Sequence, residues 1–352
     1  MNPLKAKFVK LEGSRRTHEK VRLKVILTNR GNEDLSVLAW NTPFDPMLSD
    51  CLEVTVNGKQ IKYDGPLVKR AAPTPKDYIT IKAGQSVEAE FPLSDAYDTS
   101  KPGGYDVKLR AQVPDAVPKQ TALASLMKRG VHQPTRRAIP AKTSFKMEKG
   151  DGAHRTLGAL ARNEEKAAKA PASLLRSKAA SAKKKPASGA PLAPLTTGGT
   201  AAQKADAIQS HKDGYALCLA ALAGLANDAH YVEWFGAYTA ARFNTVKANY
   251  TAMKRRLETV QFTYNLTGSG CTSGVFAYTY KGTSTIWFCD AYWQAPATGT
   301  DSKAGTVVHE HTHSDALTDD IQYGQSGCRT LAKSHPEKAI HNADTHEYYA
   351  GG

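Results

Sequence analysis

The sequence predicts a multidomain chain with an N-terminal all-β sandwich, a connector and a C-terminal α+β domain. We place the sandwich at residues 1–115, the connector at 116–205 and the α+β domain at 206–352. Three observations support this division. Apolar and polar residues alternate in the first part, Ala, Lys, Pro and Ser dominate the second, and apolar residues at helical spacing return in the third.

The strands of the first domain are predicted from alternation and from turn residues. In VRLKVILTN (21–29) apolar side chains occupy every second position, which is typical of a strand with one buried face. Asn57 and Gly58 separate two further strand-like runs and form a dipeptide preferred in type I′ hairpins. Short strands with frequent turns predict a sandwich of immunoglobulin-like size.

The formal net charge of +14 raises the question of a nucleic-acid partner. Much of the excess lies in the connector, in runs such as SKAASAKKKPASGAP (177–191). No nucleic-acid-binding motif accompanies these lysines, so we predict no nucleic-acid partner. No run of about 18 apolar residues occurs, so we also predict no membrane-spanning segment.

The third domain is predicted to contain helices followed by a strand pair. The spacing of Val232, Phe235, Tyr238 and Ala241 predicts a single helix that buries these side chains in the core. Two strand-like runs follow, on either side of a Lys-Gly turn at 281–282.

A further helix, with Asp301 or Ser302 as N-cap, carries the motif H-E-x-x-H. On a helix, His309 and His313 lie one turn apart on the same face, so both imidazoles can bind one metal ion. Glu310 is the general base that this motif supplies. A buried histidine pair beside a surface glutamate is the alternative interpretation.

The third protein ligand of a catalytic zinc must come from outside this motif. His311 points about 200° around the helix from the first histidine and cannot join the same site. The candidates downstream are Asp319 and Asp320. A metzincin spacing selects Asp319, but that motif requires a glycine where Ala316 stands.

The residues after the histidines resemble a motif of the deuterolysin family of aspzincin metalloendopeptidases. The family follows H-E-x-x-H with a G-T-x-D-x-x-Y-G block. Thr318, Asp320, Tyr323 and Gly324 match this block, while Leu317 replaces its first glycine.

The resemblance extends over roughly residues 212–350. YVEWFGAYTAARFNTV (231–246) is similar to the W-F-G-x-Y segment of the family, and FAYTYKGTSTIWFCDAYWQAP (276–296) to its strand pair. NADTHEYYA (342–350) is similar to its C-terminal block. LTNRGNEDLSVLAWNTPFDP (27–46) resembles its pro-domain.

The resemblance implies a zincin-like metalloprotease fold and one Zn²⁺ per chain, held by His309, His313 and Asp320. It implies that Glu310 takes a proton from the attacking water and passes it to the leaving amine. Tyr323 would then donate a hydrogen bond to the substrate carbonyl oxygen. The chain is therefore expected to be a zinc metalloendopeptidase that acts on proteins and peptides.

Asp344 and Glu347 are candidates for substrate binding. They lie three residues apart, on one face if the C-terminal end is helical. In the Lys-specific branch of the family, such a pair resembles the acidic floor of the pocket for the residue after the scissile bond. Because buried carboxylates favour a cation, we predict cleavage before lysine, with arginine as a second candidate. A solvated acidic face is the alternative.

A lysine-rich connector ahead of a Lys-directed peptidase predicts a zymogen that cuts itself. Cuts are expected between about residues 165 and 205, with Lys183, Lys184 and Lys185 as candidates. The N-terminal sandwich would be the pro-domain and an intramolecular partner. The resemblance indicates a secreted, extracellular, toxin-like bacterial member whose signal peptide is absent from this sequence.

Four of the five cysteines lie in the C-terminal half, which suits one or two disulfides and an oxidising compartment. Because five is odd, at least one thiol is expected to be free or to pair between chains. The family resemblance pairs Cys271 with Cys289, which flank the predicted strand pair. Cys218 with Cys328 is then predicted by elimination, and Cys51 has no assigned partner.

Two other functions are compatible with the sequence. A metzincin-like peptidase would use Asp319 in place of Asp320. A non-catalytic secreted binding or adhesion protein would keep the sandwich and a vestigial metal site, although Glu310 and Tyr323 are present.

Overall fold

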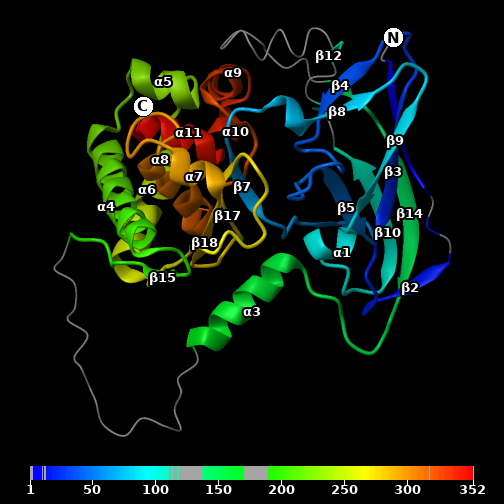
Figure 1. Cartoon of the computed structure of the whole chain (residues 1–352), viewed down its shortest axis with the longest axis horizontal. Coiled ribbons are helices and arrows are strands. Elements are labelled where there is room, and N and C mark those ends of the chain that lie inside the picture. The colour runs from blue at the N-terminus through cyan, green and yellow to red at the C-terminus, as the bar shows by residue number, and fades with distance from the viewer. Residues whose placement is uncertain are drawn as a thin grey trace, which may run out of the picture. The chain divides into compact units, whose positions relative to one another are not determined.

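The computed structural model describes residues 3–9, 11, 13–110, 112–113, 117–118, 137–169, 189–316 and 318–351 (Figure 1). The chain divides into two compact units. Unit 1 comprises Met1–Pro66 and Ala72–Leu160, and unit 2 comprises Leu67–Ala71 and Ala161–Gly352. A short segment from the N-terminal half of the sequence therefore belongs to the C-terminal unit.

Unit 1 consists mainly of β-strands. Its strands are β1 (Leu4–Phe8), β2 (Ser14–Arg16), β3 (Leu23–Asn29), β4 (Leu35–Leu38), β5 (Leu52–Val56), β6 (Lys59–Ile61), β8 (Tyr78–Ile81), β9 (Ser86–Phe91), β10 (Gly103–Leu109), β11 (Gln112–Val113), β12 (Val117–Pro118), β13 (Arg137–Ala138) and β14 (Lys142–Glu148). Two short helices are η1 (Pro75–Asp77) and α1 (Leu93–Ala96). The sheets have the strand orders β1-β3-β9, β2-β14-β10-β5-β6, β12-β4-β8 and β11-β13.

An apolar cluster fills the interior of unit 1. Leu23 and Val25 of β3 and Phe91 of β9 meet Val54 of β5 and Val107 of β10 there. Two sheets therefore face each other across the cluster. The alternation predicted for the strand at 21–29 is confirmed, because Val21, Leu23, Val25 and Leu27 are all buried. Strand β14, which lies between β2 and β10 in one of these sheets, comes after the expected end of the domain at residue 115.

The predicted hairpin joins β5 to β6. Asn57 and Gly58 have φ values of 47° and 75°. A type I′ turn requires positive φ at both central residues, so this prediction is confirmed.

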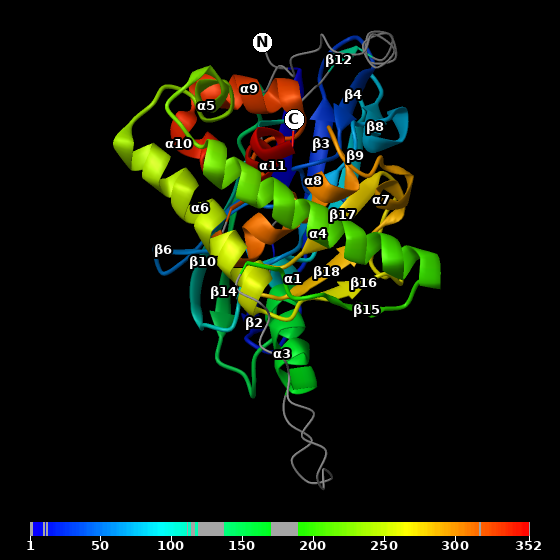
Figure 2. The same ribbon diagram turned by 90° about the vertical axis from the view of Figure 1, so that its left-hand side faces the viewer.

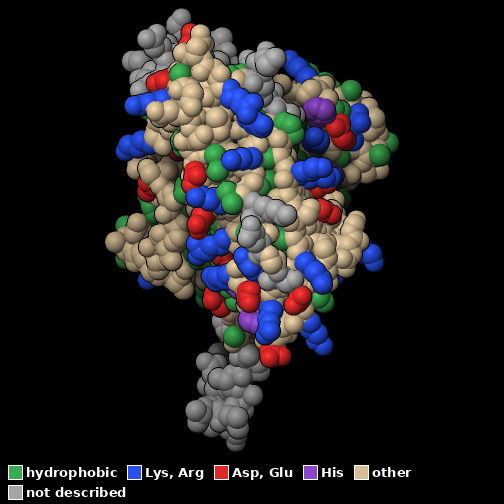
Figure 3. Space-filling view, turned by 90° about the vertical axis from the view of Figure 1, so that its right-hand side faces the viewer, with side chains coloured by type: hydrophobic (Ala, Val, Ile, Leu, Met, Phe, Trp, Pro, Cys, Tyr) green, Lys and Arg blue, Asp and Glu red, His purple; other side chains and the backbone are tan. Residues whose placement is uncertain are grey.

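Charged side chains of both signs are mixed on the sheets of unit 1. Lys24 contacts Glu88 across β3 and β9, and Lys108 contacts Glu53 across β10 and β5. Figure 3 shows Lys and Arg side chains dispersed among Asp and Glu on the face in view. Cross-strand pairs of opposite charge stabilise a sheet modestly, so Lys24 and Lys108 have a role in the stability of unit 1.

Unit 2 combines a mixed sheet with a group of helices. Its strands are β7 (Leu67–Arg70), β15 (Leu195–Thr197), β16 (Thr263–Asn265), β17 (Val275–Thr279) and β18 (Thr285–Phe288). Its helices are α4 (Ala201–Gly224), α5 (Ala229–Phe235), α6 (Ala240–Thr259), α7 (Asp290–Gln294), α8 (Lys303–His311), η2 (Thr312–Ala316), α9 (Gln325–Ser334), α10 (Pro336–Ala339) and α11 (Ala343–Gly351). Helix α3 (Leu157–Lys169) includes the boundary between the units in the sequence.

The sheet of unit 2 has the order β15-β16-β18-β17-β7. Strand β17 is antiparallel to both of its neighbours, β18 and β7. The two strands predicted around the Lys-Gly turn are β17 and β18, and this prediction is confirmed. Strand β7 forms the edge of the sheet, with Lys69 opposite Ala277 and Val68 opposite Tyr278.

Helix α8 lies inside unit 2. It packs between α4 and the β17–β7 side of the sheet, and it also contacts α11 (Figures 1 and 2). Every residue from Ala304 to His311 is buried. In the part of the chain that the structure describes, no helix is both long and apolar enough to cross a membrane.

The single helix predicted from Val232, Phe235, Tyr238 and Ala241 is wrong. Helix α5 ends at Phe235, and Gly236 follows with φ of 77°. Phe235 is buried, but Val232 and Tyr238 are 42% and 41% exposed. The chain turns at the glycine because only that residue adopts left-handed φ without steric cost, and the apolar spacing therefore does not continue on one face.

The cysteines are only partly paired. Cys271 and Cys289, which the family resemblance pairs, form a disulfide. The pairing of Cys218 with Cys328 is wrong, because both are buried free thiols. Cys218 donates to the Tyr250 carbonyl oxygen, and Cys328 to that of Gln322. Elimination failed because buried cysteines also serve as small apolar residues.

A substitution at Gly236 tests the break between α5 and α6. A Cβ atom there would lie 2.2 Å from the Ala332 carbonyl oxygen. We expect Gly236→Ala to lower the free energy of unfolding by about 2 to 4 kcal/mol, through left-handed strain and overpacking. Urea unfolding measures this change.

Gly224→Ala is the matched control. Gly224 ends α4, and a Cβ atom there would meet nothing within 4 Å. Its free energy of unfolding should stay equal or rise slightly. Equal stability of the two variants would contradict the importance of the Gly236 turn.

Candidate metal centre

The H-E-x-x-H segment spans the end of α8 and the turn that follows it. The Ser302 side chain caps the helix and accepts a hydrogen bond from the Gly305 backbone N–H. The α-helix ends at His311, and Thr312–Ala316 continue as a π-helical turn, where the sequence predicts regular helix. Such turns are frequent at functional sites because they re-aim side chains.

Three side-chain atoms converge beside this turn. Nε2 of His309 lies 3.2 Å from Nε2 of His313. The two nitrogens lie 3.1 Å and 3.3 Å from Oδ1 of Asp320. Ligands about 2.0 to 2.1 Å from a tetrahedral zinc are roughly 3.3 Å apart. The donor set and its spacing therefore fit Zn²⁺.

Burial supports the same fit. The two histidine side chains are fully buried, and Asp320 is 8% exposed. Among the described residues, no donor forms a hydrogen bond with Oδ1 of Asp320. A buried carboxylate oxygen without a donor is costly, and a cation held between the three ligands removes that cost.

The two candidate aspartates point to different partners. Asp319 contacts the Lys281 ammonium, and its side chain is 50% exposed. Its backbone bonds to His341 and Ala343 fix the chain beside the start of α11. Asp320 is consequently the one directed at the histidines. The geometry favours the deuterolysin-like ligand set over the metzincin-like one.

The convergence of these groups shifts their pKa values. Burial lowers the pKa of His309, but the carboxylates of Asp320, Asp344 and Glu347 outweigh it and raise that pKa well above the usual value. Burial alone would raise the pKa of Asp320, but His313 and His309 hold it well below its ordinary range. The cluster is therefore built to keep Asp320 charged as a ligand.

Glu310 lies between the two histidine ligands in the sequence but is not itself a candidate ligand. Its side chain is buried, and among the described residues no donor forms a hydrogen bond with either carboxylate oxygen. Burial raises the pKa of Glu310 to about 8, against the opposing effect of His309. The positive charge of Lys69 also lowers the pKa of Glu310. A carboxylate with a pKa near neutrality is suited to accept and return a proton.

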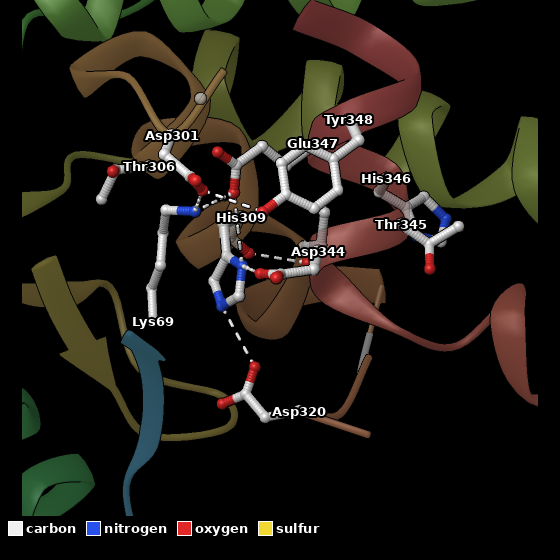
Figure 4. A network of polar contacts seen from close by, with 12 residues as sticks. Lys69, Asp301, Thr306, His309, Asp320, Asp344, Thr345, His346, Glu347 and Tyr348 are labelled. Carbon is white, nitrogen blue, oxygen red and sulfur yellow. Dashed lines mark hydrogen bonds and ion pairs between the residues drawn. The ribbon is translucent and has the colours of Figure 1, made fainter. Parts of the chain in front are cut away.

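Asp344 and Glu347, from α11, lie behind the first histidine (Figure 4). Nδ1 of His309 is 2.8 Å from Oδ1 of Asp344 and 3.6 Å from Oε2 of Glu347. Gly305 makes this approach possible, because a Cβ atom there would lie 2.5 Å from Oε1 of Glu347. The predicted substrate-binding pair is thus buried, and the solvated acidic face is excluded.

Lys69 is a buried residue of this cluster that the sequence analysis missed. Its Nζ lies 2.5 Å from Oε2 of Glu347 and 3.3 Å from Oδ1 of Asp301. The rings of Phe276 and Tyr348 lie 5.1 Å and 5.8 Å from the ammonium. Burial lowers the pKa of Lys69, but these acids outweigh it and keep the amine charged. No local signal marks this lysine, because its partners are distant in sequence.

Two further residues behave differently from the ligands. His311 faces the opposite side of α8, where Nε2 bonds to the Tyr264 hydroxyl at 2.9 Å and the ring packs on Phe262. Its exclusion from the metal site agrees with the structure. Tyr323 is half-buried between η2 and α9, and its role as a hydrogen-bond donor stays a prediction.

The fold and this centre define a metallopeptidase, since H-E-x-x-H with a third ligand downstream is the arrangement of that class. Residues 220–351 match the family described as lysine-specific metallo-endopeptidase. An extracellular protease of Aeromonas hydrophila is 31% identical, over 99% of this chain and 91% of its own length. The chain belongs to the deuterolysin family of aspzincin metalloendopeptidases.

Other relatives match the C-terminal part. A peptidyl-Lys metalloendopeptidase of Grifola frondosa is 43% identical over 34% of this chain and 34% of its own length. A solved zinc peptidase from Grifola frondosa is 35% identical, with a TM-score of 0.41, over 43% of this chain and 96% of that chain.

Conservative substitutions at the two aspartates distinguish the ligand sets. Asp320→Asn should lower zinc affinity by at least tenfold and abolish peptidase activity, because it removes a charged ligand. Asp319→Asn, its matched control, should bind zinc like the unsubstituted chain. Zinc titration followed by elemental analysis measures both. Loss of zinc from Asp319→Asn alone would favour the metzincin-like set.

Glu310→Gln separates chemistry from metal binding. We expect zinc content to be unchanged and turnover to fall on the order of a thousandfold, because a positioned base is lost. Zinc analysis and peptide cleavage on the same sample give both quantities. A variant that loses zinc and activity together would assign Glu310 a structural role instead.

Proposed function

We propose that the chain is a secreted zymogen of a zinc endopeptidase that cuts on the amino side of lysine. The observation that carries this proposal is the Lys69 ammonium buried against Glu347 and Asp301. We interpret the Lys69 ammonium as occupying the position that the ammonium of a substrate lysine would take. The names of the relatives, lysine-specific and peptidyl-Lys, support the same specificity.

The proposed chemistry assigns one task to each group. His309, His313 and Asp320 would hold one zinc ion. When bound, zinc supplies Lewis-acid activation of water and of the scissile carbonyl. Glu310 takes the proton from the attacking water and gives it to the leaving amine. Tyr323 donates a hydrogen bond to the carbonyl oxygen as negative charge develops.

Strand β7 supports the assignment of a substrate-like segment. It adds to the edge of the sheet beside β17, as extended peptides do when they bind a sheet edge. The Val68 backbone N–H donates to Oδ2 of Asp320 at 2.5 Å. The β7 segment thus brings a backbone N–H to Asp320, one of the candidate metal ligands.

The same contacts support the zymogen. Residues flanking β7 belong to unit 1, so a segment of the N-terminal half occupies the candidate lysine pocket. We infer that unit 1 is the β-sandwich pro-domain and that β7 is its inhibitory segment. The sequence divides the proposed pro-domain, connector and peptidase domain at 1–115, 116–205 and 206–352, whereas unit 1 extends to Leu160 and includes β14.

Maturation is proposed to occur by cleavage in the connector. The candidate sites Lys183, Lys184 and Lys185 lie outside the described residues. Secretion is supported by the Cys271–Cys289 disulfide, which favours an oxidising compartment, and by the extracellular protease of Aeromonas hydrophila. A toxin-like role belongs to the same proposal.

The first test is cleavage of an unfolded lysine-containing protein, with and without a chelator. We expect chelator-sensitive cuts before lysine and a shortened enzyme whose new N-terminus lies in the connector. Mass spectrometry identifies every cut. A zinc-loaded, matured chain that cuts at other residues would contradict the lysine preference, and an uncut full-length chain would contradict self-maturation.

Lys69→Met tests the inhibitory segment. Methionine keeps much of the side-chain bulk but removes the ammonium, so β7 should be held more weakly. We expect the lag before activity appears in fresh full-length protein to shorten at least tenfold. Lys82→Met, at an exposed lysine just after β8, should keep the normal lag. Equal lags in both variants would contradict this inhibition.

A further inference from the structure

The acids around the Lys69 ammonium are not equivalent. Oε2 of Glu347 lies 2.5 Å from Nζ and Oδ1 of Asp301 lies 3.3 Å from it. Asp344 affects the charge of Lys69 through space, and the ion pairs of the ammonium are those with the other two acids. The sequence predicted Asp344 and Glu347 as the pair, and gave Asp301 only a candidate capping role.

Asp344 is occupied by other partners. Its Oδ1 lies 2.8 Å from Nδ1 of His309, and its Oδ2 accepts a hydrogen bond of 2.8 Å from the Gly324 backbone N–H. A carboxylate on the outer nitrogen of a metal-binding histidine fixes the tautomer and the ring orientation. Asp344 is therefore placed to act on the metal ligand, with little freedom left to meet a substrate.

Asp301 is held toward the ammonium by its own surroundings. Its φ of 50° directs the loop before α8, and aspartate is among the residues that tolerate this conformation. The Tyr348 hydroxyl donates to its Oδ1 at 2.8 Å. The side chain is 39% exposed, whereas Glu347 is 2% exposed, so the two acids lie at the open and closed sides of the ammonium.

We propose that Asp301 and Glu347 together recognise the substrate lysine, and that Asp344 is a positioning residue for His309. This assignment rests on the proposed function, because Lys69 serves as the stand-in for a substrate lysine. The rings of Phe276 and Tyr348 line the same ammonium. An ammonium presents three donors, and the two acids each offer an oxygen to it. Asp301 is thus a specificity-determining residue supplied by the loop before α8.

The test uses the full chain after self-maturation and two peptides that differ only in the residue after the scissile bond. One peptide carries lysine and the other norleucine, which has a similar length and no charge. Asp301→Asn should lower the lysine-to-norleucine ratio of kcat/KM at least tenfold, mainly through KM. Its zinc titration should match that of the unsubstituted chain. Asparagine also tolerates positive φ, so the loop conformation is retained.

Asp344→Asn should give the opposite pattern. We expect zinc affinity to fall about 10- to 100-fold, as for other lost partners of metal-bound histidines. At saturating zinc, kcat should fall for both peptides by the same factor, with the ratio unchanged. Asp290→Asn, at an exposed acid on α7, is the control and should leave the zinc titration, both activities and the ratio unchanged.

Tyr348→Phe provides a second variant that leaves all the acids in place. Removal of the hydroxyl that holds Asp301 should lower the same ratio, by a smaller factor than Asp301→Asn. An unchanged ratio in Asp301→Asn would overturn the proposal, as would a collapsed ratio with intact zinc binding in Asp344→Asn. A failure of the proposed function would give a different result: the unsubstituted chain itself would then show no preference for the lysine peptide.

Discussion

Unit 2 depends on the burial of several carboxylates beside the histidines of α8. Asp344 and Glu347 are 2% exposed, and isolated charges at such positions are strongly unfavourable. The Lys69 ammonium compensates Glu347, and Nδ1 of His309 lies 2.8 Å from Oδ1 of Asp344. Because the compensation requires contact distances, it fixes how α8, α11 and β7 pack. Gly305 belongs to this constraint, since any side chain there would displace Glu347.

The same cluster connects remote parts of the sequence to the chemistry. Asp320 comes from the segment after η2, Lys69 from the edge strand β7, and Asp301 from the loop before α8. Each contributes one charged group, and only Lys69 lies within a strand or helix. The π-helical turn and the Asp319 backbone bonds then direct Asp320 to the two histidines. The arrangement therefore needs both local helix geometry and long-range packing.

The features predicted from the sequence are those with a short-range physical cause. The i, i+4 histidines, the Asn-Gly hairpin and the alternation in β3 depend on backbone periods and turn chemistry. Lys69 and Asp301 were missed as partners because nothing near either residue reports the fold that brings them together. The break at Gly236 was missed because apolar spacing continued through it, although the glycine was the available signal. The Cys218–Cys328 pairing failed because a count of cysteines carries no distances.

In the proposed zymogen, inhibition and specificity use one set of contacts. Lys69 is held by Glu347 and Asp301, the acids proposed to select a substrate lysine. A tethered segment competes at a high effective concentration, so it can exclude substrates without binding more tightly per contact. Cleavage of the connector leaves these contacts intact and removes only the tether, and dissociation of β7 then opens the pocket. Changes in the pocket that strengthen lysine recognition must also strengthen retention of β7, so a more selective pocket would delay release of its own pro-segment.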